Sequence, residues 1–187
     1  MLNTNLQIKT RNLILGILLM LSNQVSSQLM KFDAPLNQLY QDGLKSLYNG
    51  DSLSAYQAIQ SSHHFAPNNQ DIAFHYHLLS VALEKNQATS IAKKWLETNK
   101  NKIYQSKLYF EIAKYYFKKQ LVEDALISYK YVSIDDLENK EVALMQFQLG
   151  YLYFKKGDWE QSTNYLYSIR QIQSSPYYTD ANYYAGF

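Results

Sequence analysis

The sequence predicts an all-α protein built from repeated pairs of helices. Only 6 of its 187 residues are Gly and 3 are Pro, too few for a β-rich chain with many tight turns. Residues that favour helices, such as Ala, Leu, Lys, Gln and Glu, dominate several long windows. Small residues also recur at intervals of 33 to 37 residues, a spacing typical of two-helix repeats. With 47% hydrophobic residues, the chain can form a core.

The first 27 residues have the pattern of a secretory signal. Lys9 and Arg11 are their only charges, and they precede the apolar run LILGILLML at residues 13–21. This run is shorter than the roughly 20 residues that a membrane helix needs. We therefore expect residues 1–27 to be a signal peptide cleaved after Ser27, and residues 28–35 to be a short N-terminal segment. The mature chain is then exported, to the periplasm or the outer membrane; an uncleaved N-terminal anchor is the alternative.

Charge and cysteine content exclude several classes of protein. The chain has 18 basic and 16 acidic side chains, and Lys9 and Arg11 account for the excess. A mature chain without net charge lacks the basic excess that nucleic-acid binders usually show, so we expect no nucleic-acid partner. We also expect no membrane span in the mature chain, because it has no apolar run of the required length. Because there is no cysteine, disulfides, a lipid-modified N-terminus and thiolate metal sites are excluded.

The region from residue 36 onward predicts four complete helical hairpins and part of a fifth. Their expected ranges are about 36–69, 72–103, 104–138 and 141–175, with the partial fifth from about 177. The first helix of each contains one small residue, in order Gly43, Ser80, Ala113, Gly150 and Gly186. The breaks between paired helices are expected at Gly50–Asp51, Asn86–Gln87, Lys119–Gln120 and Gly157–Asp158.

Small residues in both helices of a hairpin allow the two backbones to approach closely. The pairs predicted to do so are Gly43 with Ala55, Ala113 with Ala125, and Gly150 with Ser162. Asp51 and Asp158 follow a glycine and are placed to cap the second helices. Large residues are expected to fill the core around these contacts, namely Tyr109, Tyr116, Tyr129, Tyr153 and Trp159.

The stretch HHFAPNNQD, residues 63–71, is interpreted as a turn between repeats. Pro67 ends a helix, and Asn68 and Asn69 can bond to nearby backbone before the next helix begins. His63 and His64 are then the exposed end of a helix. We expect no metal site, because the other two histidines are two residues apart on different faces of the next helix.

No catalytic motif is present in the sequence. It contains no phosphate-binding glycine loop, no G-x-S-x-G and no H-E-x-x-H. The acidic residues Asp135, Asp136 and Glu138 lack the spacing of a calcium loop and fall in the predicted connection between the third and fourth hairpins. We therefore expect a non-enzymatic protein without a cofactor.

The hairpin pattern resembles the tetratricopeptide repeat family. The residues that carry this resemblance are Gly43, Gly50, Ala55 and Pro67, then Ala113, Tyr116, Ala125 and Tyr129, and then Gly150, Tyr153 and Gly157. It covers about residues 36–187, although no Trp opens any unit and the second unit lacks its aromatic residue. The resemblance implies a right-handed α-solenoid whose first helices line a concave, peptide-binding groove. The chain also looks like the N-terminal array of long exported repeat proteins of Gram-negative bacteria, and we expect it to be part of a longer protein.

An aromatic stripe runs along the predicted first helices, in a chain with 18 Tyr and 8 Phe. At helical spacing it contains Phe110, Lys114 and Phe117, then Phe147, Tyr151 and Phe154, and then Tyr183 and Phe187, with Lys118 and Lys155 beside it. By the resemblance, this stripe is the candidate groove. It would bind a partner with apolar anchors and some carboxylate character. Alternatively, the rings fill the space between neighbouring units.

The sequence thus predicts a scaffold of the cell envelope that binds a partner protein or peptide through the aromatic groove. Two other functions remain open. One is a module that binds glycans or peptidoglycan, in which Tyr151 and Tyr183 stack on sugar rings. The other is the specificity arm of a longer enzyme.

Overall fold

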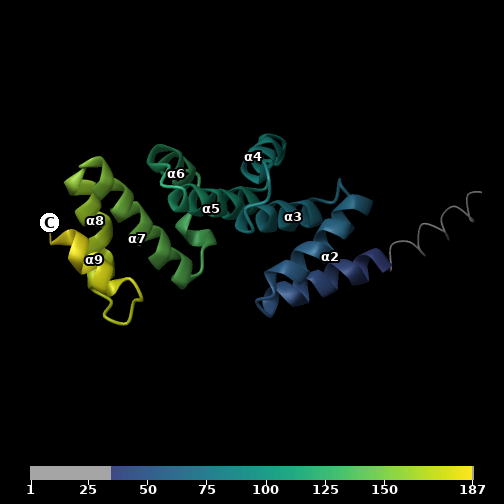
Figure 1. Ribbon diagram of the computed structural model, residues 1–187, viewed down its shortest axis with the longest axis horizontal. Helices are drawn as coiled ribbons and strands as arrows, with labels where there is room; N and C mark the ends of the chain where they lie inside the picture. Colours follow the sequence, from purple (N-terminus) through teal and green to yellow (C-terminus); the bar gives the residue numbers. More distant parts are fainter. Residues whose placement is uncertain (1–34, 187) are drawn as a thin grey trace, which may run out of the picture. The chain divides into compact units, whose positions relative to one another are not determined.

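The computed structural model describes residues 35–186, and all regular structure in this range is helical (Figure 1). The predicted all-α class is therefore confirmed for this part of the chain. The predicted signal peptide at 1–27, residues 28–34 and Phe187 lie outside the described residues. The chain divides into two compact units, Met1–Ile72 and Ala73–Phe187.

The first unit contains a helix over residues 35–48 and α2 (Ser52–Phe65). They pack closely at Gly43, where an added Cβ would lie 2.8 Å from Cγ1 of Ile59 and 3.3 Å from Cβ of Ala58. The predicted close approach is correct, but its partners at Gly43 are Ala58 and Ile59. Ala55, the partner expected from the sequence, is fully buried one turn earlier.

The segment that follows α2 is a turn, as the sequence predicted. Its last residue, Asn69, accepts hydrogen bonds through Oδ1 from the backbone N–H groups of Asp71 and Ile72, at 3.1 and 3.2 Å. These bonds cap the start of α3 (Gln70–Ala82). His63 and His64 lie in the last turn of α2.

The second unit begins within α3 and continues to the end of the described residues. After α3 come α4 (Ala88–Thr98), α5 (Lys102–Lys118), α6 (Val122–Tyr129), the short 3₁₀ helix η1 (Ile134–Asp136), α7 (Asn139–Lys156), α8 (Trp159–Arg170) and α9 (Tyr178–Ala185). Helix α5 packs against α6, α7 packs against α8, and α9 contacts both α8 and α7. None of the helices at residues 35–186 is both long and apolar enough to cross a bilayer.

The small residues lie where these helices approach each other. Ala113 of α5 and Ala125 of α6 are fully buried in one cluster, as predicted. Gly150 of α7 accepts a 2.9 Å hydrogen bond through its carbonyl oxygen from Oγ of Ser162 on α8, which confirms that predicted pair. The largest cluster joins α5, α6 and α7 and contains Phe110, Ala113, Ala125, Leu126, Tyr129, Met145, Leu149 and Leu152.

Four helices end in the same hydrogen-bonded turn, centred on Gly50, Glu84, Gln120 and Gly157. Each of these residues has positive φ, at 81°, 52°, 59° and 75° respectively. At the first turn, the N–H of Gly50 donates to the carbonyl of Leu47, and the N–H of Asp51 donates to that of Ser46. The other three turns repeat this pair of bonds, which satisfies carbonyls that a helix end leaves open.

This geometry corrects one predicted break. The second hairpin turns at Glu84, whereas the sequence placed the break at Asn86–Gln87. Gln87 is instead the left-handed residue that precedes α4. The other three breaks are where they were predicted, and Asp51 and Asp158 accept backbone hydrogen bonds as N-caps of α2 and α8.

The core residues predicted from the sequence differ in how deeply the structure buries them. Tyr129 is buried, and Tyr116 and Tyr153 are half-buried against the same cluster. Trp159 is 59% exposed, so its predicted place in the core is wrong. As the first residue of α8, it lies at the helix end and packs edge-on against the ring of Phe154.

Candidate binding surface

Aromatic rings from α5, α7 and α9 meet on one side of the second unit. The ring centroids of Phe117 and Tyr151 are 5.5 Å apart, and those of Tyr151 and Tyr184 are 5.1 Å apart. Phe154 also approaches Tyr184, at 5.2 Å. We call this surface the aromatic face and define it by Phe117, Phe147, Tyr151, Phe154, Tyr183 and Tyr184.

Tyr184 is the ring that connects the aromatic face, and the sequence did not single it out. It contacts Tyr151, Phe154 and, at 6.5 Å, Phe147. Burial raises the pKa of the Tyr184 phenol, with smaller contributions from Tyr151 and Asp180. The stripe spacing selected Tyr183, the adjacent residue, which is 61% exposed. Two consecutive tyrosines at the end of a helix give no sequence signal that decides which one turns inward.

Phe110 does not belong to the exposed surface. Its side chain is 2% exposed and lies in the cluster shared by α5, α6 and α7, with its ring 6.3 Å from that of Tyr129. The expectation that Phe110 lines an open groove is wrong. Phe110 is buried because it packs into a cluster with residues of α6 and α7, such as Tyr129 and Met145.

Most rings of the aromatic face are partly used in packing. Phe117, Phe147, Tyr151 and Phe154 are half-buried, because each touches a ring from a neighbouring helix or loop. Phe147, for example, stacks on Tyr177 at 5.1 Å. These rings therefore join adjacent helices and also keep some exposed apolar surface.

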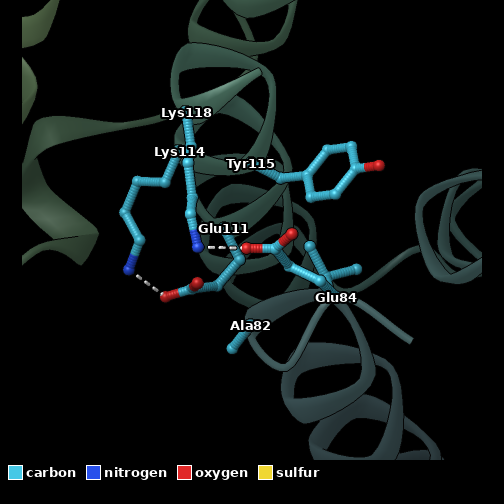
Figure 2. Close-up of a pocket in the computed structure, with 7 residues that line it drawn as sticks. Ala82, Glu84, Glu111, Lys114, Tyr115 and Lys118 are labelled. Atoms are coloured by element: carbon cyan, nitrogen blue, oxygen red, sulfur yellow. Dashed lines mark hydrogen bonds and ion pairs between the residues drawn. The ribbon is translucent and has the colours of Figure 1, made fainter.

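Two of the three lysines predicted for the groove, Lys114 and Lys118, form ion pairs with glutamates. Lys114 pairs with Glu111 at 2.5 Å, and Lys118 pairs with Glu84, as Figure 2 shows. The hydrogen bonds from Lys118 and Lys119 lower the pKa of Glu84 to about 2. These ion pairs border a hollow of about 240 Å³, lined by Val81, Ala82, Glu84, Glu111, Lys114, Tyr115 and Lys118.

Lys155 is the lysine of the candidate set that lies on the aromatic face itself. Its Nζ is 5.7 Å from the ring centroid of Tyr151, and it forms no ion pair with a carboxylate among residues 35–186. An exposed ammonium beside an aromatic ring attracts a carboxylate without needing to break an existing ion pair.

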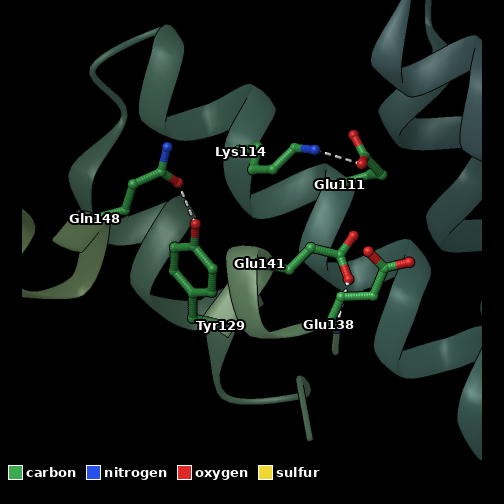
Figure 3. Close-up of polar contacts among 6 residues, drawn as sticks. All are labelled: Glu111, Lys114, Tyr129, Glu138, Glu141 and Gln148. Carbon is green, nitrogen blue, oxygen red and sulfur yellow. Dashed lines mark hydrogen bonds and ion pairs between the residues drawn. The ribbon is translucent and has the colours of Figure 1, made fainter. Parts of the chain in front are cut away.

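A buried polar contact joins α6 to α7, one of the helices that carry the aromatic face. The Tyr129 hydroxyl of α6 donates a hydrogen bond to Oε1 of Gln148 on α7 (Figure 3). Burial raises the pKa of Tyr129 well above its ordinary value, so the phenol stays protonated and remains a donor.

At the start of α7, Glu138 and Glu141 form a reciprocal capping box.

The aromatic face can bind a ligand through apolar contacts with its rings and through the charge of Lys155. In the part of the chain that the structure describes, no group of three or more His, Asp or Glu side chains could hold a metal ion. No protein-family model matches the chain, and comparisons with curated proteins and with solved structures found no match.

Proposed function

We propose that this protein is a non-enzymatic scaffold that binds a polypeptide partner on the aromatic face. The observation that carries the proposal is the gathering of half-exposed rings from three helices, with the Lys155 ammonium beside Tyr151. Aromatic side chains supply large contact areas at low entropic cost, and they are enriched among residues that dominate binding energy.

The ligand that fits this surface has apolar or aromatic anchors and a nearby carboxylate. Phe117, Tyr151 and Phe154 offer the apolar contacts, and Tyr183 extends the surface at its exposed end. Lys155 supplies the charge, because Lys114 and Lys118 already pair with glutamates. This assignment reduces the positively charged side chains of the predicted groove from three lysines to one, Lys155.

The fold and location belong to the same proposal. The four equivalent turns at Gly50, Glu84, Gln120 and Gly157 support a repeat architecture like that of tetratricopeptide proteins, as a right-handed α-solenoid. Residues 1–27 support export to the periplasm or the outer membrane. A protein or peptide of the cell envelope is the partner that fits both the repeat architecture and the export.

The test uses the purified full chain and a displayed library of short acidic peptides that contain Phe and Leu. Binding of selected peptides is compared between the wild type and the double variant Phe117→Ala, Phe154→Ala. The control is Ile127→Ala, Tyr167→Ala, which removes two exposed apolar side chains outside the aromatic face. We expect the first variant to weaken binding about tenfold or more, equivalent to about 1.4 kcal/mol, and the control to bind normally.

Two results would contradict the proposal, provided that circular dichroism shows all proteins folded. The first is that no acidic peptide is selected over a composition-matched basic library. The second is that both double variants bind as the wild type does. Retention on peptidoglycan that depends on Tyr151 and Tyr183 would favour the glycan-binding function instead.

A further inference from the structure

A second hollow lies at the opposite end of α5 from Phe117. It has a volume of about 440 Å³ and is lined by Lys102, Gln105, Ser106, Tyr131, Ser133, Asp135 and Asp136. This volume is within the range of small-ligand sites in proteins. None of these residues belongs to the aromatic face, so an inference from this hollow does not rest on the function proposed above.

Hydrogen bonds fix the walls of this hollow. The backbone N–H of Ser133 donates to Oγ of the buried Ser106 at 2.9 Å, which joins the segment after α6 to α5. The N–H of Asp136 donates to the carbonyl of Ser133 at 3.2 Å, within the turn that forms η1. Gln105 donates through Nε2 to the carbonyl of Asn99 at 2.6 Å, so its amide is also held. The two aspartates therefore stand on a short, anchored element.

An aromatic ring stands beside these carboxylates in a fixed position. Tyr131 is 58% exposed, yet its ring stacks on Tyr109 with centroids 4.4 Å apart and planes at 21°. The stacking covers one face of the Tyr131 ring and holds it in place. The rest of the ring is open to a ligand in the hollow.

The charge on the lining selects the ligand. Asp135 and Asp136 form no ion pair with a basic side chain among residues 35–186. Lys102 forms no ion pair with an acidic side chain in the same range. Two carboxylates against one ammonium leave an excess negative charge. A planar cation can stack on Tyr131 and also donate paired hydrogen bonds to a carboxylate, which a compact ammonium group does less well.

We propose that this hollow binds the guanidinium group of an arginine side chain in a polypeptide ligand. The guanidinium stacks on the open side of Tyr131 and donates hydrogen bonds to Asp135 or Asp136. Lys102, which also lines the hollow, repels a second cation and favours a ligand in which the arginine is flanked by neutral or acidic groups.

The test is a titration of the full chain, labelled with ¹⁵N, with N-acetyl-arginine amide. The neutral isostere N-acetyl-citrulline amide has the same shape without the charge. We expect saturable shifts of the amide signals of Ser133, Asp135 and Asp136 with the arginine probe, in the millimolar range, and affinity at least about tenfold weaker with the citrulline probe.

Variants decide whether the lining residues are responsible. We expect the double variant Asp135→Asn, Asp136→Asn to weaken binding of the arginine probe about tenfold or more. Tyr131→Leu removes the ring and tests the stacking separately, because its exposed side chain can change without altering the core. The matched control, Glu160→Gln with Asp180→Asn, removes two exposed carboxylates of α8 and α9 and should bind normally.

Several outcomes would overturn the proposal. They are the absence of saturable shifts around η1, equal affinity for the arginine and citrulline probes, and unchanged affinity in the aspartate variant. Shifts at the same residues with N-acetylglucosamine but not with the arginine probe would also overturn it, in favour of a sugar site.

Discussion

Tyr129 of α6 donates a hydrogen bond to the side-chain oxygen of Gln148 on α7, and both side chains are buried. This contact joins two successive helical hairpins through a polar pair within an otherwise apolar cluster. A buried polar group without a hydrogen-bond partner costs free energy of folding. Each of these two side chains is tolerated in the core because the other supplies its partner.

Tyr129→Phe should lower the free energy of unfolding by about 1–3 kcal/mol, because it leaves the Gln148 oxygen buried without a donor. Chemical unfolding of the full chain, followed by circular dichroism, measures this change. In the double variant Tyr129→Phe, Gln148→Leu, neither polar group remains, so the cost should be smaller than in the single variant. A double variant less stable than the sum of the two single changes would contradict this account.

Gly150→Ala should destabilise the protein by about 1–3 kcal/mol through overpacking. An added Cβ would lie 2.5 Å from Cγ of Leu166 and 3.4 Å from its backbone nitrogen. The side chain of Leu166 causes the closest conflict, so the cost of Gly150→Ala should fall by about 1 kcal/mol in a Leu166→Ala background. Equal costs in both backgrounds, from a double-mutant cycle of unfolding free energies, would show that the two residues are not coupled.

Gln120→Gly should stabilise the protein by about 0.5–1 kcal/mol. Gln120 has φ of 59°, a conformation that costs a side chain roughly 1 kcal/mol and that glycine adopts freely. The equivalent residue Gly157 provides the control with opposite sign. At Gly157 an added Cβ has only Trp159 nearby, at 3.9 Å, so Gly157→Ala should destabilise through the backbone alone. Thermal or urea unfolding of both variants checks the two signs.

Glu84 should make stability depend on pH in the acid range. Its carboxylate accepts hydrogen bonds from Lys118 and Lys119, and its pKa falls from the ordinary 4.5 to about 2. Because the pKa is lower in the folded state, the stabilisation is complete above the unfolded-state value and is lost as pH falls through the folded-state value. Glu84→Gln should therefore be less stable than the wild type at neutral pH, and this difference should disappear towards about pH 2.

The control for this pH dependence is Glu160→Gln, which removes an exposed carboxylate with no ion pair among residues 35–186. Urea unfolding at neutral pH and at about pH 3 gives the comparison. A stability difference between Glu84→Gln and the wild type that stays constant across this range would exclude the ion pairs as its source. High salt should reduce the difference at neutral pH, because the pairs are partly exposed.

Tyr184 should matter more for stability than its neighbour Tyr183. Tyr184→Ala removes a ring that contacts Tyr151, Phe154 and Phe147, and should cost about 1–3 kcal/mol. Tyr183→Ala removes a ring that is 61% exposed, and should cost less than about 1 kcal/mol. Unfolding free energies of the two variants test whether Tyr184 contributes more to the packing of the aromatic face than Tyr183. Equal losses of unfolding free energy would show that it does not.

Part of the candidate surface could be read from the spacing of residues along the helices. Phe117, Tyr151 and Phe154 do come together, because residues three and four apart share one face of a helix. Phe110 shares that spacing but is buried, because it packs into the cluster that α5 forms with α6 and α7. The ion pair of Lys118 was missed because its partner Glu84 lies in the turn after α3, 34 residues earlier, and no helical spacing connects the two. Lys114 pairs with Glu111 on the same helix, at the i, i+3 spacing.

The sequence by itself determined the all-α class, three of the four breaks and the aspartate caps, because these depend on local preferences of glycine, proline and capping residues. The tertiary structure decided the turn at Glu84, the inward position of Tyr184 and the exposure of Trp159. It also brought Tyr131 and two aspartates to one hollow beside α5. These features depend on which helix packs against which, and that is set by contacts between residues far apart in the chain.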